Sequence, residues 1–152
     1  LGHHHCLRGA EFYQNKPIFY GLGNFMFDIV NLEKHFSPEL MASWRERFGE
    51  NAFGPREGYP TYPFPALYRI TAIGVIAVDA AGKMRAGFVP AEVQPDGRPL
   101  PYKLDTDDGR RVSDYIAKCM KGIGSSWALR PAADLLGDHG VLEIVPAELS
   151  SL

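Results

Sequence analysis

The sequence predicts an α+β fold with antiparallel strands and two main helices. Short aromatic and β-branched runs separated by turn residues recur along the chain, which is typical of antiparallel strands. Apolar residues at helical spacing follow Ser37 and Thr106, two residues that can cap a helix. With 45% hydrophobic and 22% charged residues, the composition is that of an ordinary globular protein. We therefore expect a single domain over residues 1–152.

The first expected element is a hairpin. Residues 11–13 and 18–20 form its strands, and Gln14-Asn15-Lys16-Pro17 is a turn-rich connection between them. Pro17 is expected to begin the second strand, where its missing N–H costs little. The following Gly21-Leu22-Gly23-Asn24 stretch is unusual for a strand because it holds two glycines. Either this backbone approaches a bound phosphate or carboxylate closely, or it packs tightly against a neighbouring helix.

The first helix begins after Ser37. Pro38 suits the first helical position, and Glu39 lies near the positive end of the helix dipole. Gly49 is expected to end the helix. One apolar face is expected to be part of the core, and it consists of Leu40, Met41, Trp44 and Phe48.

Residues 49–65 form an irregular loop rich in glycine, proline and aromatic residues. Loops of this length are uncommon unless they carry a function. One interpretation is a lid over a metal site, in which Arg56 and the tyrosines touch an anionic substrate. The alternative is an aromatic loop packed on the protein surface.

The second half predicts a meander, a helix and two late strands. Residues 67–78 and 84–93 are antiparallel strands, and residues 95–98 make a further turn. Thr106 caps a helix that Gly122 or Gly124 ends. Its core-facing stripe consists of Val112, Tyr115, Ile116, Cys119 and Met120. The late strands, 127–130 and 141–145, pair around the turn at 137–140.

Charge and cysteine usage exclude several classes. The net charge is 16 minus 18, or −2, which gives no basis for binding nucleic acid or an anionic membrane. No apolar run approaches the roughly 20 residues of a transmembrane helix. Cys6 and Cys119 belong to no Cys-x-x-Cys pair, so we expect both cysteines to be small residues of the core. His35 and His139 are isolated, and a surface or capping role is expected for both.

Three consecutive imidazoles, His3, His4 and His5, suggest a metal site. In an extended segment His3 and His5 project to the same side, where they could share one metal cluster. Neutral imidazole is a common ligand for zinc, manganese and iron. The alternative is that the three histidines are the remnant of an affinity tag.

Two stretches carry a resemblance to a known family. The stretches are Gly2-His3-His4-His5-Cys6-Leu7-Arg8-Gly9-Ala10-Glu11 and Lys16-Pro17-Ile18-Phe19-Tyr20-Gly21-Leu22-Gly23-Asn24-Phe25. Together they resemble the CapA family of poly-gamma-glutamate capsule-synthesis proteins, which is related to the calcineurin-like metallophosphatases. Gly2, His3 and His5 match the Gly-His-x-His motif, the last metal motif of those enzymes. The earlier motifs, Asp-x-His, Gly-Asp-x-x-Asp and Gly-Asn-His-Asp or Glu, are absent from these 152 residues.

The resemblance implies that the chain is the C-terminal portion of a four-layer αββα metallophosphatase sandwich. Residues 1–28 would carry the metal-motif strand and the hairpin. His3 and His5 would bind a pair of Mn, Fe or Zn ions, and His4, Arg8 and Asn24 would contact the substrate. The other ligands would come from the missing N-terminal half of the same protein, so no catalytic residue is assigned here and the isolated chain is expected to be inactive.

The function implied by the resemblance is phosphoester hydrolysis by metal-activated water in a bacterial protein linked to capsule synthesis, in the cytoplasm or the cell envelope. The substrate would be a phosphoester or an anionic polymer. The alternative from another class is a non-catalytic accessory component of capsular polymer synthesis or export. A third interpretation, a truncated chain, predicts exposed apolar surface and self-association.

Overall fold

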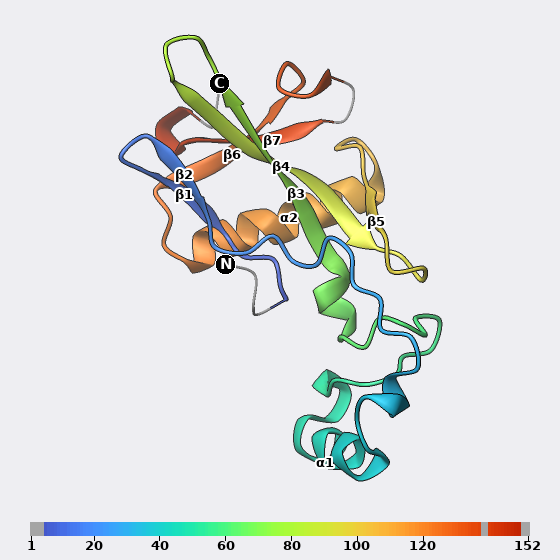
Figure 1. The fold of residues 1–152 in the computed structure, drawn as a ribbon. Coiled ribbons are helices and arrows are strands. Elements are labelled where there is room, and N and C mark those ends of the chain that lie inside the picture. Colours follow the sequence, from blue (N-terminus) through green and yellow to red (C-terminus); the bar gives the residue numbers. More distant parts are fainter. Residues whose placement is uncertain (1–4, 138–139, 150–152) are drawn as a thin grey trace.

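The computed structural model describes residues 5–137 and 140–149, and its fold is α+β with antiparallel sheets (Figure 1). The α-helices within these residues are α1 (Pro38–Phe48) and α2 (Asp107–Gly122). The strands are β1 (Ala10–Tyr13), β2 (Lys16–Phe19), β3 (Ile70–Val78), β4 (Met84–Val93), β5 (Pro99–Pro101), β6 (Trp127–Ala132) and β7 (Val141–Pro146). Short 3₁₀ turns occur at Leu32–Lys34, Gly49–Asn51, Ala66–Arg69 and Ala147–Leu149. The predicted α+β class, with antiparallel strands and two main helices, is therefore confirmed.

Strands β1 and β2 form the expected hairpin, but its turn is tighter than predicted. Tyr13 pairs with Lys16, so only Gln14 and Asn15 connect the strands. Both have positive φ, at 48° and 59°. Two such residues in a row define the hairpin turn whose twist matches that of the flanking strands. The expected connection is too wide because Lys16 already belongs to β2, whereas Pro17 lies in the second strand as predicted.

The main sheet has the strand order β3-β4-β7-β6, with β5 paired to β4. All of its pairings are antiparallel, and the β3–β4 hairpin, the longest element of the sheet, turns at residues 79–83 as predicted. Strand β3 begins later than expected, because residues 66–69 after Pro65 form a 3₁₀ turn. The late strands pair as predicted, with Arg130 opposite Glu143.

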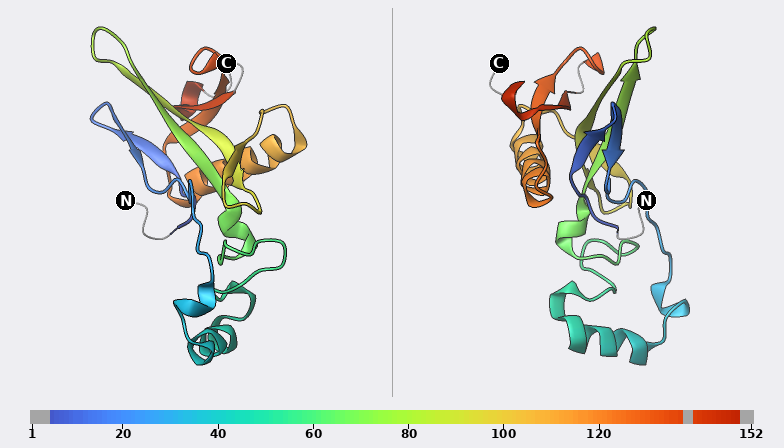
Figure 2. Two further views of the ribbon diagram at one scale, coloured as in Figure 1. Left: turned by 45° about the vertical axis from the view of Figure 1, so that its right-hand side comes forward. Right: turned by 90° about the vertical axis from the view of Figure 1, so that its left-hand side faces the viewer.

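Helix α2 packs along the main sheet (Figure 2). Thr106 caps it as predicted, because the Thr106 hydroxyl accepts from the Gly109 N–H at 3.0 Å. Val112, Ile116 and Met120 are buried, and they pack in one core with Leu7 and Phe88 among others. Cys6 is buried, as expected of a small core residue, and Cys119 is half-buried.

Helix α1 lies on a segment that projects from the rest of the molecule (Figures 1 and 2). Ser37 caps it, and Gly49 follows its last residue, as predicted. The expectation that its apolar face belongs to the core is wrong, because no residue of α1 is buried. Leu40 and Phe48 are 41% and 49% exposed. The chain is hydrogen-bonded to Thr71 of β3 as far as Asn24 and enters the main sheet at Ile70, and the segment between them carries α1 away from that sheet (Figure 1).

The loop at residues 49–65 contributes to a second apolar cluster. Tyr62, Phe64 and Val93 are the buried residues of this cluster, which we call the aromatic cluster. Partly buried Phe27, Phe53, Tyr59 and Tyr68 pack around them. The loop is irregular as predicted, but the idea that its aromatic side chains simply rest on the surface is wrong. Those side chains face inwards and pack around Val93 of β4, and this packing anchors the projecting segment.

Candidate functional site

His5 is linked to the aromatic cluster through the side chain of Asn24. The two side chains meet at 2.7 Å, between His5 Nδ1 and Asn24 Oδ1. Asn24 Nδ2 donates to the His5 carbonyl at 3.2 Å and to the Tyr62 hydroxyl at 2.7 Å. The Tyr62 hydroxyl in turn lies 2.5 Å from the carbonyl oxygen of Tyr68. These hydrogen bonds form a chain from the tyrosine carbonyl to the imidazole.

The direction of this chain fixes which nitrogen of His5 carries a proton. The Tyr68 carbonyl can only accept, so the Tyr62 hydroxyl donates to it. The hydroxyl oxygen must then accept from the NH₂ end of the Asn24 amide, which orients the amide. Asn24 Oδ1 is left facing His5 and can only accept, so His5 Nδ1 carries the hydrogen. In a neutral imidazole the lone pair then lies on Nε2.

Aromatic rings hold the imidazole in place. The His5 ring lies edge-on to Phe27, with centroids 5.3 Å apart, and 4.7 Å from the ring of Phe64. Asn24 is 5% exposed and Tyr62 is fully buried. Burial raises the pKa of Tyr62 to about 12, so its hydroxyl stays protonated and remains a donor at neutral pH.

The backbone of residues 21–24 is held against β3. The Thr71 hydroxyl lies 2.7 Å from the carbonyl oxygen of Leu22 and 2.8 Å from that of Asn24. Gly23 has a φ of 81°, and a Cβ there would lie 2.8 Å from Thr71 Oγ1. Gly23 is therefore packed tightly, and its neighbour is a strand and not a helix. This packing presents Asn24 to His5.

The described residues include only some of the predicted site residues. His5 and Asn24 are brought together, whereas His3, His4 and His139 lie outside the described residues. Arg8 is exposed. Burial raises the pKa of the Cys119 thiol, and the positive charge of Arg8 acts to lower it. The local backbone at His5 also differs from the prediction. Its φ is 51°, so the extended segment expected to run through His5 is wrong at this residue.

Sequence reasoning did not find the contribution of Tyr62. One of the two interpretations of the loop had its tyrosines and Arg56 touching an anionic substrate. Tyr62 instead orients Asn24 from within the core, and the Arg56 guanidinium donates to the carbonyl of Ala52. The signal that could have pointed to Tyr62 is weak. It is one of several tyrosines in the loop, and 38 residues separate it from Asn24.

The described part of the chain does not hold a complete metal site. Within residues 5–137 and 140–149, no group of three His, Cys, Asp or Glu side chains could hold a metal ion. No helix in the same residues is long and apolar enough to cross a membrane. No protein-family model and no curated protein matches the chain.

Proposed function

We propose that this chain is the C-terminal part of a CapA-like, calcineurin-like metal-dependent phosphoesterase, with His3 and His5 as metal ligands. The observation that carries the proposal is the hydrogen bond from His5 Nδ1 to Asn24 Oδ1, at 2.7 Å. Metal-binding histidines almost always donate their second ring N–H to an acceptor, which fixes the tautomer and the ring orientation. Asn24 supplies that acceptor, so Nε2 of His5 is the nitrogen suited to a metal.

The residues present fit a divalent metal in ligand type. An oriented neutral imidazole suits Zn, Mn or Fe. His5 is hydrogen-bonded to Asn24 and packs against the rings of Phe27 and Phe64. A histidine from a tag remnant is not expected to make such contacts, which argues against that alternative for His5. His3 would add a second ligand, and polypeptide outside the described residues would supply the rest. A bound metal pair would provide an activated water for attack on a phosphoester.

Within this proposal we assign Asn24 to positioning His5. Its carbonyl oxygen accepts from the imidazole, and its NH₂ group donates to the His5 carbonyl and to Tyr62. Both N–H groups of the amide are used and the side chain is buried, so we place Asn24 behind His5 rather than against the substrate. Arg8 remains a proposed contact for the substrate's negative charge because its side chain is exposed. His4 is proposed for the same purpose from the sequence resemblance alone.

The architecture is compatible with part of a four-layer sandwich. The main sheet with α2 on it forms a helix layer and a sheet layer. In the proposed full-length protein, the missing half would contribute the other sheet and its helices. The apolar residues of the projecting segment, such as Met26 at 73% exposure, would then offer contact surface to it.

Metal binding by the 152-residue chain tests the proposal without relying on turnover. In NMR spectra recorded during a Mn²⁺ titration, we expect the His5 ring signals to broaden before those of the exposed His35. An Asn24→Leu variant should weaken this broadening, because leucine has the same shape but cannot accept from Nδ1. A His35→Gln variant is the matched control. Equal broadening at both histidines, or no effect of Asn24→Leu in a chain that keeps its circular dichroism, would contradict the proposal.

Activity distinguishes the enzyme from the accessory alternative. We expect no phosphoesterase turnover from the 152-residue chain alone, because its described residues lack a complete ligand set. In a longer protein that includes the chain, hydrolysis of bis(4-nitrophenyl) phosphate and bound metal should both be lost in His3→Ala and His5→Ala. Binding of an anionic polymer without bound metal or hydrolysis would favour the accessory component. Turnover by the 152-residue chain that disappears in His3→Ala would contradict the present assignment.

A further inference from the structure

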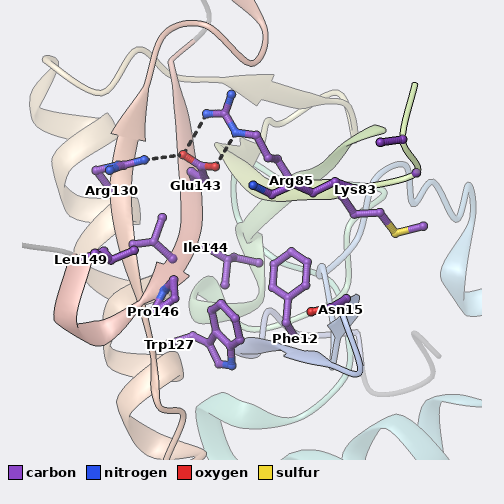
Figure 3. A pocket seen from close by; sticks show the side chains of 14 residues that line it. Phe12, Asn15, Lys83, Arg85, Trp127, Arg130, Glu143, Ile144, Pro146 and Leu149 are labelled. Atoms are coloured by element: carbon purple, nitrogen blue, oxygen red, sulfur yellow. Dashed lines mark hydrogen bonds and ion pairs between the residues drawn. The ribbon is translucent and has the colours of Figure 1, made fainter. Parts of the chain in front are cut away.

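A cleft opens where β4 and β7 separate. The two strands pair only at Gly87 with Glu143 and at Phe88 with Leu142. Gly87 permits this close approach, since a Cβ there would lie 2.5 Å from the carbonyl oxygen of Leu142. Beyond the crossing, β4 continues with β3 and β7 continues with β6, and the strands diverge. The divergence leaves a cavity of about 730 Å³ (Figure 3). Its size is that of a pocket for a small organic ligand.

A buried carboxylate organises the charged side of the cleft. Glu143 is 5% exposed, and its two oxygens accept from Arg85 at 2.6 Å and 3.0 Å. Arg130 donates to the same carboxylate at 3.1 Å. Arg85 also pairs with Asp134 at 2.6 Å. Because Arg85 holds the pKa of Glu143 below its ordinary value, the carboxylate stays ionised and keeps the guanidinium groups in place.

The lining of the cleft is nevertheless positive. The lining includes three cationic side chains, Lys83, Arg85 and Arg130, and one carboxylate, that of Glu143. The ammonium group of Lys83 makes no ion pair with any residue in the described part of the chain. Arg130 uses one N–H on Glu143, and a guanidinium has five. Donors therefore remain on Lys83 and Arg130 for an anion.

The opposite side of the cleft is aromatic. Phe12 from β1 and Trp127 from β6 lie with ring centroids 5.0 Å apart and line the cavity together (Figure 3). Ile144 and Pro146 of β7 extend this apolar wall. Such a surface favours the flat face of a ring, whereas a small inorganic anion would leave it in water.

We propose that this cleft binds a small organic anion with a flat apolar part, such as an aromatic carboxylate. Lys83 and Arg130 hold the anion, and the flat part packs on Trp127. Arg85 acts as a positioning residue, since Glu143 and Asp134 already engage its guanidinium. The lining residues include neither His5 nor Asn24, so the inference stands or falls independently of the metal proposal.

The test uses 2-naphthoate as probe and the indole N–H signal of Trp127 as readout. We expect 2-naphthoate to shift this signal saturably, while the signal of Trp44 on the projecting segment stays in place. The neutral analogue 2-naphthylmethanol and the small anion acetate should each bind more weakly, because each offers only half of the required chemistry. Lys83→Met should weaken 2-naphthoate binding roughly three- to ten-fold, the range expected for losing one partly exposed charge contact.

Lys121→Met is the matched control, because it removes the same charge from an exposed site on α2, which does not line the cleft. It should leave 2-naphthoate binding unchanged. Equal weakening by Lys83→Met and Lys121→Met would show a general effect of net charge and overturn the proposal. Equal binding of the neutral analogue, or shifts of Trp44 as large as those of Trp127, would overturn it as well.

Discussion

Replacing Tyr62 with phenylalanine removes one oxygen atom from the centre of the hydrogen-bond chain. The ring can keep its place in the aromatic cluster, where Tyr62 is fully buried. Two groups lose a partner: the carbonyl of Tyr68, 2.5 Å away, and one N–H of Asn24, 2.7 Å away. The NH₂ group of Asn24 keeps its hydrogen bond to the His5 carbonyl, so only one of its two N–H groups loses its partner. The variant therefore tests the hydrogen bonds without creating a large cavity.

The expected cost follows from those two losses. A buried polar group left without a partner costs about 1–3 kcal/mol, and removing the hydroxyl returns part of its desolvation penalty. We expect Tyr62→Phe to lower the free energy of unfolding by about 1–3 kcal/mol, or roughly 2–4 °C in Tm for each kcal/mol in a chain of this size. Urea unfolding followed by far-ultraviolet circular dichroism measures this change.

Tyr59→Phe is the matched control. Tyr59 belongs to the same cluster, and its hydroxyl makes no hydrogen bond with the residues that the structure describes. We expect its free energy of unfolding to stay within about 0.5 kcal/mol of the unsubstituted protein.

The same variant has a second readout, the tautomer of His5. Long-range ¹H–¹⁵N spectra at pH 8 should show the hydrogen on Nδ1 in the unsubstituted protein. In Tyr62→Phe the Asn24 amide loses one of the two acceptors that orient its NH₂ group and keeps only the His5 carbonyl, so amide reversal costs less and the Nε2–H tautomer should become more populated. The reasoning is refuted if Tyr62→Phe is no more destabilising than Tyr59→Phe and leaves the His5 nitrogen shifts unchanged.

Three further predictions concern packing and charge. Gly23→Ala should cost about 2–4 kcal/mol and Gly82→Ala about 1 kcal/mol, because both have φ near 80° but only Gly23 meets a neighbour; equal costs in urea unfolding would contradict the packing argument. Glu143→Gln should cost roughly 1–3 kcal/mol at pH 7. Since two guanidinium groups lower the folded-state pKa of Glu143, its stabilisation is present above the unfolded pKa near 4.3 and is lost as the pH falls through the folded pKa. Unfolding from pH 7 to pH 3 should therefore show the variant approaching the unsubstituted protein on the acidic side, and a constant difference would argue against the ion pairs. Ile116→Ala should lower the free energy of unfolding by about 2–4 kcal/mol and Phe48→Ala by less than about 1 kcal/mol, because Ile116 is fully buried and Phe48 is 49% exposed. Thermal unfolding compares the two variants. A larger loss of stability for Phe48→Ala would mean that α1 is covered in solution.

Local chemistry explains which elements the sequence could predict. Ser37 and Thr106 each cap a helix through their own hydroxyl, so both helix starts are encoded within three residues. Strands β3 and β4 are long enough for their β-branched residues to stand out. The turn at Gln14 and Asn15 was placed too widely, because Lys16 is a polar residue beside turn residues and only its pairing with Tyr13 shows that it belongs to the strand.

The apolar face of α1 shows where local pattern stops. Helical spacing of Leu40, Trp44 and Phe48 predicts a helix and its apolar side, and it says nothing about a partner for that side. The partner depends on the path of the chain, which carries α1 away from the sheet. Trp44 packs instead on Phe36 and Phe53 of the same segment. The helical spacing is a local pattern, whereas the contact that it was used to predict depends on residues far away in the sequence.

The candidate site has the same division, and it explains what a sequence motif can and cannot supply. The sequence motifs single out His5 and Asn24 by their residue types. The hairpin between these two residues then brings their side chains together. The state of the imidazole is decided further away. Tyr62 reaches Asn24 across 38 residues, and the acceptor that directs Tyr62 is a backbone carbonyl, which every residue has. No residue pattern can encode that carbonyl's position, so the protonated nitrogen of His5 is a property of the fold.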